Sequence, residues 1–283
     1  MSIVFLLSAP RSGSSFLSRL IHTGGYQSFV SPGSHLQGNT PFNPDGYFED
    51  VKLSLLCDQV IRWRFGLRFS FLHPPRFEPD ISVEYSPDFQ YDLDHATVQI
   101  PNDYLNRLQE FTGQTWDVWG LSRMRPGEKW WRAYERFGIR HASQVRTQLM
   151  ELSRSIEEFS NLTIVKDPRL VFCLDQFRVH TKKIIVLTRD QKLTCKSIQS
   201  HYGPRILSNH PFEGFDWVSN HFNYQVNPQD PAEVFASYGQ WLKFQTEHCQ
   251  DSLHISLESI ADGSGIAELE KFLGVSLESS AIG

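Results

Sequence analysis

The residues best suited to bind a charged ligand lie in residues 8–15, SAPRSGSS, between an apolar run and a helix-like pattern. Gly13 allows the backbone to approach a ligand closely, Arg11 supplies a cation, and Ser14 and Ser15 supply hydroxyl donors. The first backbone N–H groups of a helix have no partner within it and carry a partial positive charge. We therefore expect a phosphate-binding loop here, although a Ser/Gly-rich turn can also simply cap a helix.

This segment differs from the nucleotide-triphosphate P-loop, GxxxxGK[ST], at two informative positions. Ser14 stands where that motif has its lysine, and Ala9 lies close to the position of its first glycine. The loop is therefore suited to holding a phosphate but poorly equipped to handle a Mg²⁺-bound γ-phosphate.

A second candidate anion site follows another apolar run. Arg189 comes directly after residues 184–188, IIVLT, and Ser197 lies eight residues later in a helix-like segment. Eight residues are about two helical turns, so a guanidinium at the strand end and this hydroxyl can reach one phosphate. Taken alone, Arg189 and Asp190 would be read as a surface pair that caps a helix.

Together these motifs resemble those of PAPS-dependent sulfotransferases, in the bacterial type whose loop carries arginine, as in tyrosylprotein sulfotransferases. Residues 10–17, PRSGSSFL, resemble the family's 5′-phosphosulfate loop, and Arg189 with Ser197 resembles its 3′-phosphate site. Residues 43–50, NPDGYFED, and 165–170, VKDPRL, resemble further family segments. The resemblance implies sulfuryl transfer from PAPS to a hydroxyl or amine, release of PAP, and no metal requirement.

The resemblance also implies roles for residues of the donor site. Arg11 and the backbone N–H groups of Ser12, Gly13, Ser14 and Ser15 would hold the 5′-phosphosulfate. Lys166 resembles a lysine that contacts the transferring group and would supply a second cation. The alternative for Lys166 is a surface lysine paired with Asp167, and Arg169 would either do similar work or form a salt bridge across the turn.

The transfer also needs a general base to take the proton of the acceptor. Glu49 is the first candidate, because a carboxylate beside Tyr47 and Phe48 is partly desolvated and its pKa rises toward neutrality. His35 is the second, because histidine titrates near neutrality without help. Alternatively, Glu49 is only an N-cap or hinge residue at the start of the helix that follows, although Asp50 is the more obvious N-cap.

Two features depart from the family pattern. Leu257 precedes Glu258 at the end of the last predicted strand, where relatives often have tyrosine, which removes one expected nucleotide contact. The Arg-Lys-Gly segment that clamps the 3′-phosphate in animal cytosolic enzymes is not visible before Gly283.

The elements that must position these residues are apolar strands alternating with amphipathic helices. We predict strands at residues 3–8, 162–165, 183–187 and 253–257, and helices at 14–22, 190–200, 232–249 and 266–273. This order predicts an α/β fold, a P-loop-like three-layer sandwich whose central parallel sheet is flanked by helices. Ligands of such sheets bind at the carboxyl ends of the strands, where both anion motifs fall.

The middle of the chain has a different character. Residues 63–148 are rich in proline, tryptophan and arginine and show little periodicity. We expect them to form a cap of loops and short helices that shapes the acceptor pocket of a single domain, residues 1–283. The acceptor would be a small molecule, a sugar or a carrier-bound metabolite.

Composition limits the possible partners and location. The net charge of −5, with both signs interspersed, argues against nucleic-acid binding, and no run is long enough to span a membrane. The four dispersed cysteines form no disulfide or zinc pattern and favour a cytoplasmic protein without a metal. The oligomeric state cannot be read from the sequence.

Two other functions remain open at this point. One is a nucleotide or small-molecule kinase with an altered P-loop, which would require Mg²⁺. The other is a non-catalytic nucleotide-binding protein that retains the donor site.

Overall fold

A computed structural model of the chain describes residues 2–31, 48–50, 52–54, 56–57, 60, 142–177, 179, 182–202, 231–247, 249 and 251–278. His35 and most of the predicted cap lie outside these residues.

The described chain forms a five-stranded sheet in the order β2-β3-β1-β4-β5, and every pair of neighbouring strands is parallel. The strands are β1 (Ser2–Ser8), β2 (Gln27–Ser28), β3 (Leu162–Lys166), β4 (Lys182–Thr188) and β5 (Ser252–Ser256). The predicted parallel α/β sandwich is therefore confirmed.

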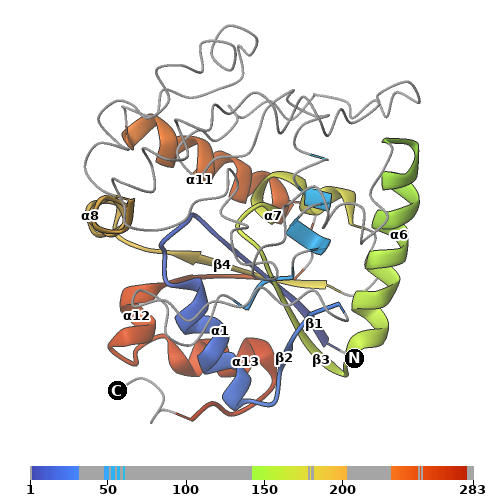
Figure 1. The fold of residues 1–283 in the computed structure, drawn as a ribbon. Coiled ribbons are helices and arrows are strands. Elements are labelled where there is room, and N and C mark those ends of the chain that lie inside the picture. The colour runs from blue at the N-terminus through green and yellow to red at the C-terminus, as the bar shows by residue number, and fades with distance from the viewer. Residues whose placement is uncertain are drawn as a thin grey trace, which may run out of the picture.

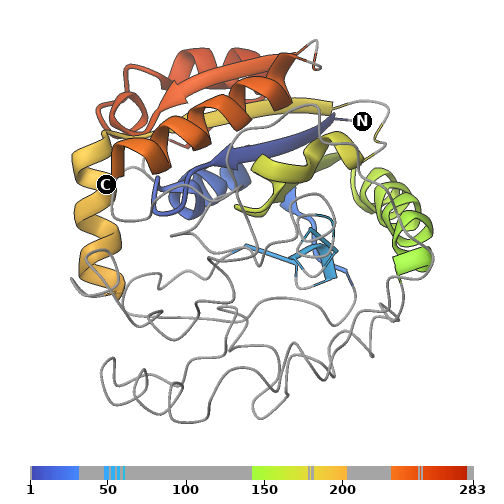
Figure 2. The ribbon, with the colours of Figure 1, turned by 90° about the horizontal axis from the view of Figure 1, so that it is seen from above.

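Helices cover both faces of this sheet (Figure 1). One face carries α1 (Ser14–Thr23), α12 (Leu257–Ala261) and α13 (Ile266–Leu273), and the other carries α7 (Leu170–Cys173) and α11 (Pro231–Glu247). The helices α6 (Ala142–Phe159) and α8 (Gln191–Tyr202) lie at opposite sides of the molecule (Figure 2). A short 3₁₀ turn, η1 (Leu174–Gln176), follows α7.

The central strand is apolar on both sides because both of its faces are covered. Residues 3–7 of β1 are all buried, so the strand lacks the polar alternation of a half-exposed strand. Val4 and Leu6 belong to the cluster that includes Leu17 of α1 and Leu269 of α13. Since successive side chains alternate between faces, Phe5 points to the opposite layer. The continuous apolar run is thus explained by the two helical layers.

Three elements differ from the sequence-based expectation. β2 and α6 were not predicted, and α6 begins at Ala142, within the range 63–148 assigned to the cap. The last strand was placed at residues 253–257, but β5 ends at Ser256 and Leu257 begins α12. Ser256 causes this change, because its hydroxyl accepts a hydrogen bond from the backbone N–H of Ser259 and caps the helix.

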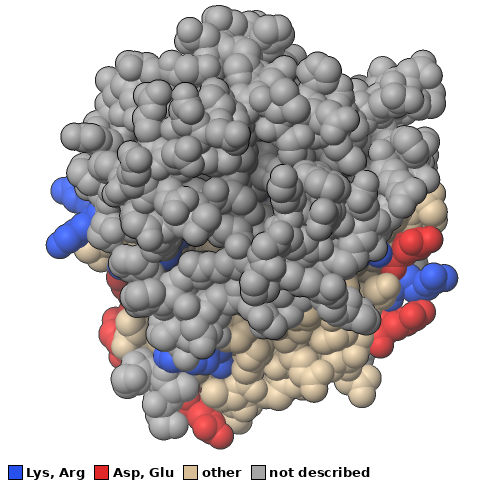
Figure 3. Space-filling model, viewed as in Figure 1, with Lys and Arg blue, Asp and Glu red and all other residues tan. Residues whose placement is uncertain are grey.

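Acidic and basic side chains are interspersed on the described part of the face shown in Figure 3. Among the helices that the structure describes, none is long and apolar enough to span a bilayer.

Candidate functional site

Three predicted site segments meet at one edge of the sheet. The loop of residues 9–13 follows β1, Lys166 is the last residue of β3, and Arg189 follows β4 directly. β1 lies between β3 and β4, with Leu6 beside Lys166 and Ser8 beside Leu187 in the register. Residues separated by more than 150 positions are therefore brought to the carboxyl ends of adjacent strands.

The N-terminus of α1 has features that suit an anion. Its N-cap, Gly13, has φ +89° and no side chain that would satisfy the first N–H groups, and the first turn contains no acidic residue. Ser12 is buried, whereas Ser14 and Ser15 are half-buried at the start of the helix. The positive end of the helix dipole is thus not opposed by a carboxylate from its own first turn.

The N-terminus of α8 is arranged differently. The Asp190 side chain accepts a hydrogen bond from the N–H of Leu193, and the Asp190 N–H donates to Glu258 Oε1 at 3.1 Å. Two carboxylates therefore occupy this helix end. A phosphate near β4 has to be held by side chains such as Arg189 and Ser197 rather than by the dipole of α8.

The two predicted phosphate sites are joined by direct contacts. Arg11 Nε donates to Ser197 Oγ at 3.3 Å, and Arg189 Nη1 donates to the carbonyl oxygen of Arg11 at 3.0 Å. The structure thus brings Arg11, Arg189 and Ser197 together, through the side chain of Arg11 on one side and its backbone carbonyl on the other. Two cations at one edge of the sheet favour a ligand with more than one negative charge.

Backbone strain coincides with this site. Among the described residues, the non-glycine residues with positive φ are Arg11 (62°) and Phe48 (56°). Both are next to candidate site residues, because Arg11 is in the loop and Phe48 precedes Glu49. The hydrogen bond from Arg189 stabilises the strained backbone at Arg11. The edge-on contact between the rings of Phe48 and His22, whose centroids are 5.0 Å apart, stabilises the strained backbone at Phe48.

Lys166 links the phosphate loop to Glu49. Its Nζ atom lies 3.0 Å from Ser15 Oγ and 2.8 Å from Glu49 Oε1, and both charged side chains are almost fully buried. The carboxylate of Glu49 is the ion-pair partner seen for Lys166, while Asp167 forms an ion pair with Arg169. Lys166 is not a surface residue, since only 5% of it is exposed.

Burial raises the pKa of the Glu49 carboxyl, and the charge of Asp167 adds to this rise. The positive charge of Lys166 and its hydrogen bond oppose the rise, as does Arg169. A buried carboxylate with a raised pKa has the properties of a general base.

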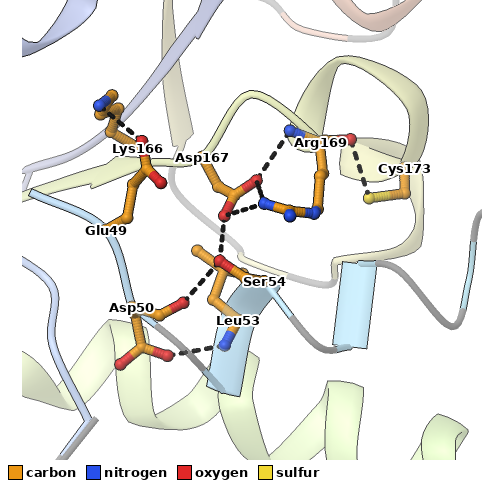
Figure 4. Close-up of polar contacts among 8 residues, drawn as sticks. All are labelled: Glu49, Asp50, Leu53, Ser54, Lys166, Asp167, Arg169 and Cys173. Atoms are coloured by element: carbon orange, nitrogen blue, oxygen red, sulfur yellow. Dashed lines mark hydrogen bonds and ion pairs between the residues drawn. The ribbon is translucent and has the colours of Figure 1, made fainter. Parts of the chain in front are cut away.

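Next to the Glu49–Lys166 pair lies a buried hydrogen-bond network that sequence reasoning missed (Figure 4). The Ser54 hydroxyl donates to Asp167 Oδ2, while the backbone N–H of Arg169 donates to Asp167 Oδ1 at 2.8 Å. Asp50 accepts from the N–H of Leu53 at 2.6 Å and is therefore the N-cap, as the sequence suggested. The network joins the turn after Glu49 to the carboxyl end of β3.

Leu257 lies directly over the phosphate loop. A Cβ atom added at Gly13 would come within 2.7 Å of both Leu257 methyl carbons. Leu257 therefore packs against the loop as an apolar wall. Only the packing of β5 beside β4 brings these two residues together, so no local sequence signal identifies the contact.

The structure leaves some predictions without a test. His35, the second candidate base, lies outside the described residues. Within the described ranges, no group of three or more His, Cys, Asp or Glu side chains is arranged to hold a metal ion.

Comparison with known proteins adds no relative to this picture. Searches against protein-family models, curated proteins and solved structures found no match to the chain.

Proposed function

We propose that this protein is a sulfotransferase that uses PAPS and releases PAP. The observation that carries the proposal is the contact between the two predicted anion sites, in which Arg11 bonds Ser197 and Arg189 bonds the loop carbonyl. A donor with a 5′-phosphosulfate and a 3′-phosphate requires two anion sites a short distance apart. The position of Arg11 and Arg189 after adjacent parallel strands supports this proposal, because ligands of such sheets bind at the carboxyl edge.

The residues present fit such a donor. When bound, PAPS supplies the sulfuryl group and a leaving 5′-phosphate. Arg11 and the N–H groups of residues 12–15 hold the 5′-phosphosulfate, while Arg189 and Ser197 hold the 3′-phosphate. These groups stabilise negative charge where it grows on the leaving oxygen, and they are fixed before the reaction begins.

Glu49 and Lys166 divide the remaining work. Glu49, whose pKa is raised by burial, takes the proton of the acceptor hydroxyl or amine, and His35 is the alternative base. Lys166, bonded to Ser15 at the loop, places a further cation beside the transferring group. The protein's own side chains thus supply both the proton acceptor and the charge stabilisation, consistent with a reaction that needs no metal.

The composition of the chain suggests an acceptor class and a location. We propose a small molecule, a sugar or a carrier-bound metabolite as acceptor and a cytoplasmic location, following the composition of residues 63–148 and the dispersed cysteines. A kinase with an altered P-loop and a non-catalytic nucleotide-binding protein are the competing functions.

Calorimetric titration with PAP in EDTA tests the proposal. Wild type should bind PAP more tightly than ATP, and Arg189→Ala should weaken PAP binding by about 10- to 100-fold, the cost of losing hydrogen bonds to a charged group. Arg154→Ala is the matched control, because the Arg154 side chain is 70% exposed and pairs with Glu158 on α6.

Each other outcome points elsewhere. ATP binding that beats PAP and requires Mg²⁺ would favour the kinase. Equal PAP affinity in Arg189→Ala and wild type would show that the 3′-phosphate is not held at β4. PAP binding by wild type without sulfuryl transfer to any hydroxyl or amine of an acceptor panel would favour the non-catalytic alternative.

A further inference from the structure

One buried ammonium group serves both the phosphate loop and the candidate base. Lys166 Nζ lies 3.0 Å from Ser15 Oγ and 2.8 Å from Glu49 Oε1. Ser15 is in the first turn of α1, where the anion-binding N–H groups begin. Glu49 and Lys166 are 8% and 5% exposed, so water screens their attraction weakly.

The charges that face Glu49 come mainly from the end of β3 and the turn after it. They are the cation Lys166, the anion Asp167 and the cation Arg169. Asp50, on the same segment as Glu49, directs its carboxylate to the N–H groups of Ser31 and Leu53. Of these groups, Lys166 contributes most to keeping Glu49 ionised against the cost of burial.

An anion in the loop would also interact with the ammonium group of Lys166. A phosphate or sulfonate oxygen held by the first turn of α1 adds negative charge near Lys166 and competes with Glu49 for its N–H donors. Both effects disfavour the ionised carboxylate. The proton affinity of Glu49 then rises as the loop fills.

We propose that Lys166 couples occupancy of the phosphate loop to the protonation state of Glu49. The inference rests on the proposed function in one respect, which is that the donor nucleotide is the ligand of the loop. Its consequence is that the proton affinity of Glu49 is higher with the donor bound than without it. The fraction of Glu49 that stays ionised is then a stronger base toward the acceptor hydroxyl at the moment when a sulfuryl group is available.

Proton uptake during binding measures this coupling without any acceptor. PAP is titrated near neutral pH in buffers of different ionisation enthalpy, and the slope of the observed enthalpy gives the protons exchanged. Wild type should take up more protons than Glu49→Gln, and its PAP affinity should fall relative to that variant as pH rises. The difference between the two proteins cancels the ionisation of PAP itself.

Two further variants locate the effect. Lys166→Met removes the shared cation, so an anion in the loop no longer draws positive charge away from Glu49 and the extra uptake should be lost. Lys243→Ala is the matched control and should keep the wild-type uptake, because the Lys243 side chain is 78% exposed and pairs with Glu247 on α11. Uptake that persists in Lys166→Met at the wild-type level would contradict the coupling.

A measurement on wild type alone protects the test against misfolded variants. The ¹³C resonance of the Glu49 carboxyl, in protein labelled at glutamate, should titrate at higher pH with saturating PAP than without it. An unchanged titration, together with equal proton exchange in wild type and Glu49→Gln, overturns the inference. If PAP does not bind at all, the proposed function fails, and the same titration with inorganic pyrophosphate then decides the coupling separately.

Discussion

At the scale of single residues, both the backbone conformation of Gly13 and its contact with Leu257 favour glycine at this position. Its φ of +89° is one that L-residues adopt at a cost of about 1–2 kcal/mol. In addition, its missing side chain leaves room for the Leu257 methyl groups. Because a leucine side chain can rotate away, the steric contact costs less than the backbone strain. The larger consequence of a side chain here is a blocked approach of phosphate to the loop.

We therefore predict that Gly13→Ala lowers the unfolding free energy by about 1–2 kcal/mol and weakens PAP binding by about tenfold or more. Urea unfolding and calorimetry measure the two effects. Gly263→Ala is the matched control, because Gly263 has φ +82° with open space around its Cα. This control should show the stability cost and keep the PAP affinity. Similar PAP affinities in both variants would contradict the proposed role of Gly13 in holding the donor phosphate.

At the scale of elements, the buried Asp167–Arg169 pair fastens the turn of residues 50–54 to the carboxyl end of β3. Ser54 reaches Asp167 from the helical turn, and Asp167 accepts hydrogen bonds from Arg169. Removing one partner of a buried ion pair leaves an uncompensated charge, which costs about 3–5 kcal/mol. Replacing both partners by uncharged groups costs much less.

A double-mutant cycle tests this fastening. Asp167→Asn should lower the unfolding free energy by about 3–5 kcal/mol, and Asp167→Asn combined with Arg169→Met should recover part of that loss. Ser54→Ala, which removes one hydrogen bond and no charge, should cost about 1 kcal/mol in the same urea titrations. The cycle is completed by Arg169→Met alone. If the effects of Asp167→Asn and Arg169→Met simply add in the double variant, then Asp167 and Arg169 do not act as a pair.

The element scale also shows what the sequence could and could not predict. The apolar runs of β1 and β4 predicted buried parallel strands, because only strands covered on both faces are apolar throughout. β2 has two residues and therefore almost no periodic signal. The bond between Ser54 and Asp167 spans 113 positions, so no local spacing announces it. The sequence predicted the strands and helices whose own residues show an apolar pattern. It did not predict the contacts that form between segments far apart in the chain.

At the scale of the whole molecule, the C-terminal segment closes the fold at the end of α1 away from the phosphate loop. Leu277 is buried in the cluster shared with β1, and its N–H donates to Glu270 at 2.7 Å. The N–H of Glu278 donates to Thr23 Oγ1 at 2.9 Å, at the last residue of α1. Since α1 has 10 residues and is about 15 Å long, this closure and the candidate site are well separated.

This arrangement predicts that stability and ligand binding separate. Leu277→Ala should cost about 2–5 kcal/mol of unfolding free energy, as buried leucine truncations do, while PAP affinity below the unfolding temperature stays at the wild-type value. The neighbouring exposed residue supplies the control, because Ser276→Ala should change stability by less than about 0.5 kcal/mol.

The same variant reports on cooperativity across the sheet. Trp241 is buried in α11, on the face opposite to the cluster that contains Leu277. The chain has seven tryptophans, so a signal specific to Trp241, its indole N–H resonance in NMR spectra, is followed instead of fluorescence. If both helical layers unfold together with the sheet, Leu277→Ala should shift the urea midpoint equally in far-UV circular dichroism and in this resonance. A Trp241 transition that stays in place while the dichroism transition moves would show that the two layers unfold separately. A single domain predicts one cooperative core that includes both the residues around Leu277 and the layer around Trp241. Separate transitions would contradict this prediction.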